Sequence, residues 1–130
     1  MSYISKTRVG VTCTASGATV DTLVRGGGLF YGVAYTLGTA SAFATGAGFS
    51  LSRVGPGGLG SAVICAWGVA TAPSEKYPRF EGHTSAGATA ASGSYANMMP
   101  LAAGDILRIV VASGGASGNG WFDLYVEGQI

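Results

Sequence analysis

The sequence predicts an all-β domain built as an antiparallel β-sandwich. No stretch of the chain repeats apolar residues at i, i+3, i+4 and i+7, the spacing of an amphipathic helix. Several stretches instead alternate apolar and polar residues with period two, and glycine clusters separate them. The length of 130 residues is that of one domain. Residues 1–130 are therefore expected to form a single sandwich.

The first strand is expected near the N-terminus, because the residues there separate by parity into two faces. The inward set is Tyr3, Thr7, Val9, Val11 and Cys13, and the outward set is Lys6, Arg8 and Thr12. A turn is expected at Ser16-Gly17, where the strand pattern stops.

Three further strands are expected at residues 29–37, 43–53 and 63–69. The second of these contains Gly46 and Gly48, either of which predicts a bulge. The run 63–69 is apolar on both faces, which is typical of a strand in the middle of a sheet or against a partner.

The C-terminal region predicts a hairpin, because two alternating segments flank a glycine-rich stretch at residues 113–120. With Val111 opposite Phe122, one face would collect six apolar side chains, namely Leu107, Ile109, Val111, Phe122, Leu124 and Val126. On the other face Arg108 would lie across from Tyr125, with Asp123 and Glu127 as diagonal neighbours. Residues 70–100 lack such alternation, so loops with one or two short strands are expected there.

The chain is poor in charge, and this excludes several classes of function. Charged residues make up 10% of the chain and the net charge is +1, against about 25% charged residues in ordinary domains. Neither a disordered chain nor a nucleic-acid binder has this balance. A free monomer normally keeps a charged exterior, so we infer that other copies or a larger assembly cover part of this surface.

No targeting or membrane segment is expected. The early charges are not followed by the apolar run of a secretory signal. The uncharged stretch at residues 26–52 is rich in glycine, serine and threonine, which argues against a membrane span. One histidine and two cysteines form no zinc pattern. Because synthesis in the cytosol is expected, Cys13 and Cys65 are expected to be free thiols in the core.

No catalytic residue, cofactor or metal site is expected. Residues 55–60 match the spacing G-x-G-x-x-G, yet a strand rather than a helix follows, so these glycines predict a hairpin loop. His83 lies in a glycine- and serine-rich loop with no nucleophile motif beside it, and the acidic residues are scattered. The chain is therefore expected not to be an enzyme.

The candidate interface residues are Trp67, Tyr77, Arg79 and Phe80. Residues 75–80 place two aromatic rings and three charged side chains around Pro78. Tyrosine and arginine are typical anchors of protein interfaces. The alternative for this segment is a loop that caps the end of the sandwich. Trp67 and Trp121 also suggest a sugar-stacking platform, but packing in the core or an interface is the favoured interpretation for both.

Three segments carry a resemblance to a known group of proteins. These are Tyr77-Pro78-Arg79, residues 100–115 (PLAAGDILRIVVASGG) and residues 120–126 (GWFDLYV), together with the start Met1-Ser2-Tyr3. The chain resembles small virion proteins encoded in the head-gene region of tailed bacteriophages. Residues 101–105 and the last strand are also similar to trimeric jelly rolls of the complement and tumour-necrosis-factor type, which implies a jelly-roll-like sandwich.

This resemblance implies a structural protein of the virion, made in the host cytoplasm. A capsid decoration or cement protein would bind the major capsid protein or other virion proteins, and it would form a homo-oligomer, with a trimer among the candidates. Nucleic acid and membrane are not expected as partners. Two alternatives remain open at this stage: a receptor- or glycan-binding module of a tail or head fibre, and a component of the neck or tail.

Overall fold

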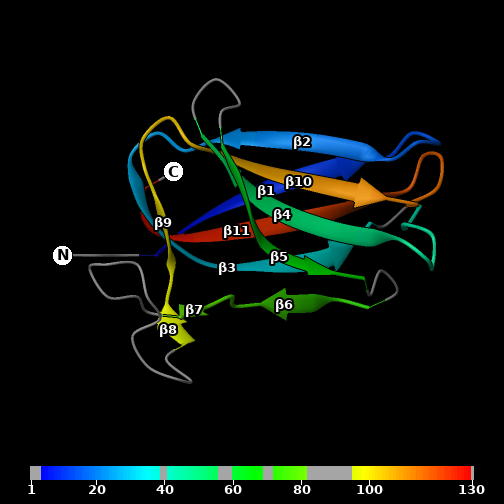
Figure 1. Cartoon of the computed structure of the whole chain (residues 1–130). Coiled ribbons are helices and arrows are strands. Elements are labelled where there is room, and N and C mark those ends of the chain that lie inside the picture. Colours follow the sequence, from blue (N-terminus) through cyan, green and yellow to red (C-terminus); the bar gives the residue numbers. More distant parts are fainter. Residues whose placement is uncertain (1–3, 39–40, 56–59, 69–71, 82–94, 130) are drawn as a thin grey trace.

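The structure is a computed structural model that describes residues 4–38, 41–55, 60–68, 72–81 and 95–129. The described chain consists of strands joined by turns and loops (Figure 1). In chain order the strands are β1 (Ile4–Thr12), β2 (Ala18–Leu23), β3 (Gly27–Leu37), β4 (Gly48–Val54), β5 (Ser61–Trp67), β6 (Ser74–Lys76), β7 (Phe80–Glu81), β8 (Tyr95–Asn97), β9 (Met99–Leu101), β10 (Ile106–Ala112) and β11 (Asn119–Gln129).

Two antiparallel sheets pack face to face, which confirms the predicted sandwich (Figure 1). One sheet has the order β1-β11-β3-β6, with β9 also paired to β3, and the other has the order β2-β10-β4-β5. Without the short strands β7, β8 and β9, eight strands remain, and β10 and β11 become the seventh and eighth of them. The two sheets then have the strand orders 1-8-3-6 and 2-7-4-5. This is the strand order of a jelly roll.

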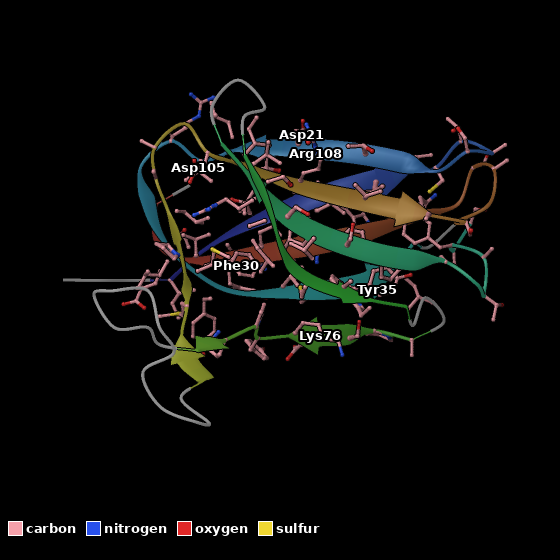
Figure 2. All side chains as sticks on the ribbon, viewed as in Figure 1. Asp21, Phe30, Tyr35, Lys76, Asp105 and Arg108 are labelled. Atoms are coloured by element: carbon pink, nitrogen blue, oxygen red, sulfur yellow. The ribbon has the colours of Figure 1, made fainter. Side chains whose placement is uncertain are left out.

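The predicted inward faces are confirmed where the structure describes them, and Tyr3 lies outside the described residues. Val9 and Val11 on β1 are buried, as are the alternating apolar residues of β10 and β11. Figure 2 shows Phe30 and Tyr35 on β3 between the sheets, and both are almost completely inaccessible. Period-two alternation fixed these faces because each sheet has one face on the core and the other in contact with water.

The predicted hairpin of β10 and β11 is wrong. β10 pairs with β2 and β4, whereas β11 pairs with β1 and β3 in the opposite sheet. The loop between them crosses from one sheet to the other and is held by the backbone, since the Cys13 N–H donates to the Gly118 carbonyl at 2.8 Å. Alternation determines which side of a strand is buried, but both sheets bury their inner faces, so it could not distinguish these pairings.

The ion pairing predicted from that hairpin changes accordingly. Arg108 lies opposite Asp21 on β2 rather than Tyr125 (Figure 2). Asp123 lies opposite Arg8 on β1. Arg108 and Asp123 therefore both pair with residues from the N-terminal part of the chain, because β2 lies beside β10 and β1 lies beside β11.

Other strands differ from their predicted positions. β2 was not predicted, β4 begins at Gly48, and Phe43 enters the core from the preceding loop. The described register shifts lie on β3 at Tyr31, on β5 at Ile64 and between β7 and β8, so the bulge predicted at Gly46 or Gly48 is wrong. The described part of residues 70–100, together with Leu101, contributes four short strands in place of one or two. β5 is an edge strand, so the expectation of a place in the middle of a sheet is wrong.

An aromatic cluster fills one half of the core. Phe122 lies 5.2 Å from Phe49, 5.3 Å from Tyr35 and 6.1 Å from Trp67, measured between ring centroids. Phe43 completes the cluster at 5.6 Å from Phe49. The rings come from both sheets and from a loop, so they connect the two layers across the sandwich.

Replacement of Phe122 by alanine should lower the free energy of unfolding by about 3 to 5 kcal/mol, because it removes the ring at the centre of this cluster. The measurement is equilibrium unfolding in urea, followed by tryptophan fluorescence. Ile4→Ala serves as the control, since Ile4 is exposed and its loss should change stability by less than about 0.5 kcal/mol. Equal effects of the two substitutions would contradict the assigned core.

Candidate functional site

The exposed aromatic side chains of the described residues, Tyr77 and Trp121, lie on the outer face of the β1-β11-β3-β6 sheet. The register aligns Gly10, Trp121 and Thr36 in one row across the sheet, then Arg8, Asp123, Ala34 and Glu75, then Lys6, Tyr125 and Gly32. We call this surface the outer aromatic face and define it by Arg8, Tyr31, Glu75, Tyr77, Trp121 and Asp123.

Trp121 lies over a glycine. A Cβ atom built on Gly10 would be 2.8 Å from the Trp121 ring, so only glycine at this position allows the ring to rest on β1. The Arg8 guanidinium carbon lies 5.6 Å from the centroid of the same ring, within the range of a cation–π contact. Trp121 nevertheless remains 41% exposed. Its position is thus fixed by the sheet while part of its surface stays open to a partner.

Tyr77, which follows β6, rests in the same way on a glycine of β3. Its ring would be 2.6 Å from a Cβ atom on Gly32, and its hydroxyl donates a 2.7 Å hydrogen bond to the Glu75 carboxylate. That hydrogen bond raises the pKa of the Tyr77 hydroxyl. Tyr77 is 47% exposed, so a second oriented ring is accessible on this face.

The bulge on β3 brings Tyr31 to Tyr77. Tyr125 pairs with Gly32 and Val126 with Phe30, which leaves Tyr31 as the extra residue. The Tyr31 and Tyr77 rings meet edge to face at 5.6 Å, a favourable aromatic geometry.

Arg79 fixes the loop that carries Tyr77. Its Nη1 donates to the carbonyl oxygens of Tyr31 at 2.9 Å and of Pro78 at 2.8 Å. Its guanidinium carbon also lies 5.2 Å from the Tyr31 ring centroid. Arg79 therefore orients the aromatic residues of this surface as well as contributing charge to it.

Two bidentate ion pairs lie on opposite outer faces of the sandwich. Arg8 donates to both carboxylate oxygens of Asp123 at 2.9 and 3.1 Å, and Arg108 donates to both of Asp21 at 2.8 and 3.0 Å. Hydrogen bonds from these arginines lower the pKa of each aspartate. The Asp123 side chain is 8% exposed and that of Asp21 is 40% exposed, so the first pair is less screened by solvent.

The structure brings together two of the four predicted interface residues, Tyr77 and Arg79. Trp67 lies on β5, in the other sheet. Its indole N–H donates to the Ser74 hydroxyl of β6 at 3.1 Å, and its ring packs on Phe49. Phe80 begins β7, and its side chain is outside the described residues. His83 and residues 56–59 also lie outside them.

Sequence reasoning missed the roles of Arg8 and Tyr31 in this surface. Trp121 was left between the core and an interface, and the strand beside β11 was assigned incorrectly. The available signal was one glycine inside each of two strands, Gly10 in β1 and Gly32 in β3. A glycine inside a strand marks a close approach by another group.

The cysteines are free thiols, as predicted. Cys13 is buried, whereas Cys65 on β5 is only partly buried. Burial raises the pKa of Cys65 to about 11, so this thiol stays protonated near neutral pH and is a weak nucleophile.

Within the described ranges, no three side chains of His, Cys, Asp or Glu are grouped so that they could hold a metal ion. No helix in the same ranges has the length and apolar character needed to cross a membrane.

Comparisons with known proteins give one weak structural match. No family model matches the chain, and no curated protein matches it. A solved structure described as "Structure of infectious bursal disease virus Gx strain" is similar over 98% of this chain and 30% of that chain, with 18% sequence identity and a TM-score of 0.30. This chain thus spans under a third of that chain. At this TM-score the likeness does not bear on function.

Asp123→Asn should destabilise the protein at neutral pH more than Asp21→Asn does, because Asp123 is the more buried carboxylate. The folded-state pKa of Asp123 is lowered, so its contribution to stability is complete above the unfolded pKa of about 3.9 and is lost as the pH falls through the folded value. The measurement is the urea midpoint of each variant at about pH 7 and about pH 2.5. A difference between wild type and Asp123→Asn that persists undiminished in acid would contradict this assignment.

Proposed function

We propose that this protein is a non-enzymatic structural component of a virion. In this proposal it is a capsid decoration or cement protein, made in the host cytoplasm, that binds the major capsid protein on the assembled head. The outer aromatic face is the contact surface. The observation that carries the proposal is the combination of a charge-poor exterior with exposed rings that are already oriented.

The charged side chains of this surface bind groups of their own chain, and this supports the proposal. Arg8 and Asp123 neutralise each other on the outer aromatic face, and Arg79 binds backbone carbonyls of its own chain. Such a surface presents aromatic area with little net charge, which is the composition of the buried centre of protein interfaces.

The fixed geometry of the rings lowers the cost of association. Trp121 rests on Gly10 and Tyr77 rests on Gly32, so each ring has a position before a partner arrives. Side chains that are already ordered lose less conformational entropy on binding. Tryptophan, tyrosine and arginine are also the residue types that most often dominate binding energy.

The jelly-roll topology and the sequence resemblance agree with this role. Jelly rolls occur in viral capsids, and also in lectins and cupins, so the fold by itself does not select among them. The resemblance of residues 77–79, 100–115 and 120–126 to phage head-gene products favours the virion. A shell offers many equivalent sites, and an oligomer that engages several of them gains a high effective concentration.

The double substitution Tyr77→Ala and Trp121→Ala should reduce occupancy of purified particles about tenfold or more, since it removes both oriented rings. Occupancy is measured by co-sedimentation of the labelled protein with particles that lack the native copy. Circular dichroism checks that the variant is folded.

Two controls accompany this test. Leu23→Ala removes an exposed apolar side chain from the other sheet, and Tyr77→Phe keeps the ring but loses the hydrogen bond to Glu75. Both should leave occupancy within about threefold of wild type. Absence of the chain from the mass spectrum of purified particles would overturn the proposal. Retention on a glycan array that depends on Trp121 would favour the glycan-binding alternative, and sedimentation with tails instead of heads would favour the neck or tail.

A further inference from the structure

The edges of the two sheets differ in their protection against pairing with another strand. Among the described strands, the outermost ones are β1, β6 and β9 in one sheet and β2 and β5 in the other. β9 contains Pro100. β1 carries Lys6 and Arg8, β2 carries Asp21, and β6 carries Glu75 and Lys76. β5, with the sequence SAVICAW, carries no charge and no proline. Charged residues and prolines are the usual means of blocking edge pairing, so only β5 lacks them.

The β5 edge is also apolar and accessible. Val63 is 62% exposed, the highest value among the large hydrophobic residues of the described chain, and Ala66 is exposed as well. Within the described strands β5 pairs with β4 alone, so alternate backbone N–H and C=O groups of its seven residues point away from the sheet. This edge therefore offers both hydrogen bonds and apolar area.

The surface next to this edge is uncharged too. A shallow hollow of about 400 Å³ is lined by Gly48, Phe49, Ser50, Ala66, Trp67, Val110 and Ala112. It extends from β5 across β4 to β10 on the outer face of the same sheet. The nearest ion pair on this sheet, Arg108 with Asp21, lies further along β10 and β2. At the other end of β5, Arg53 of β4 lies opposite Ala62 and donates to the Pro100 carbonyl of its own chain at 3.3 Å. The uncharged edge is therefore continuous with an uncharged hollow at its Ala66–Trp67 end.

We propose that β5 is a self-pairing edge, which joins antiparallel to β5 of a second copy of this chain and extends the sheet to eight strands. The occupant follows from the charge distribution. An uncharged strand meets no like charge when it pairs with itself. Pairing with β1, β2 or β6 of a second copy would instead place Val63 beside charged side chains.

Symmetry favours the same occupant. A twofold axis between two β5 strands hides both unprotected edges at once and closes the assembly, whereas β5 paired with a different edge leaves one β5 open at the end of every chain of copies. The twofold axis also keeps the two Val63 side chains on the same outer face of the extended sheet. This inference goes beyond the proposed function and does not depend on it, because it concerns the isolated protein.

Val63→Lys is the test, because it places two like charges on one face of the paired strands. Wild type should sediment as a concentration-dependent dimer in analytical ultracentrifugation. Val63→Lys should raise the dimer dissociation constant about 100-fold. Hydrogen exchange should also show that β5 amides protected in the wild-type dimer become exposed in the variant.

Matched variants separate edge pairing from a general effect of added charge. Ile4→Lys on β1 and Leu23→Lys on β2 introduce the same charge at exposed apolar positions of other edges, and both should dimerise like wild type. Val63→Ile, which keeps a β-branched apolar side chain, should also dimerise. A wild type that stays monomeric up to millimolar concentration would overturn the inference. So would an oligomer, a trimer included, that Val63→Lys leaves intact.

Discussion

The fold depends on the aromatic cluster between the sheets. Val, Ile, Leu and Phe make up only 29 of the 130 residues, which is close to the lower limit for a packed core. Each large ring buries more apolar area than an aliphatic side chain does. Phe122 on β11 contacts rings from the facing sheet and from its own, so one residue couples both layers. A chain with so few aliphatic residues can stay folded because its rings are concentrated at one place.

Glycine makes this use of rings possible, inside the core and on the surface. A Cβ atom on Gly120 would be 2.7 Å from the Phe43 ring and 2.9 Å from the Tyr35 ring. Gly10 and Gly32 play the same part on the outer face, beneath Trp121 and Tyr77. The high glycine content is therefore not a sign of a loose chain at these positions. It allows rings to approach strands closely, and it thereby links the packing of the core to the geometry of the candidate site.

The sequence was sufficient to predict which side of each strand is buried, but not which sheet each strand joins. The alternation in β10 and β11 identified all six inward residues, yet a jelly roll places these consecutive strands in opposite sheets. Charge pairing could have distinguished the two arrangements, because Arg8 and Asp21 otherwise lack partners. For the candidate site, Tyr77 and Arg79 were recognisable from residue type around Pro78. Tyr31 was not, since only the β3 bulge turns it toward Tyr77.

The two proposed contact surfaces do not overlap, and together they would account for the scarcity of charge. The outer aromatic face belongs to the β1-β11-β3-β6 sheet, and the unprotected edge belongs to β5 in the other sheet. Trp67 and Ser74 join the two sheets at the side where β5 and β6 lie, so an added strand at β5 would continue its own sheet and leave the opposite face accessible. A pair of copies joined at β5 would present two aromatic faces to a repeating surface. Once one face is bound, the second face would bind at high effective concentration. A charge-poor exterior would then have a function that it would not have in a free monomer.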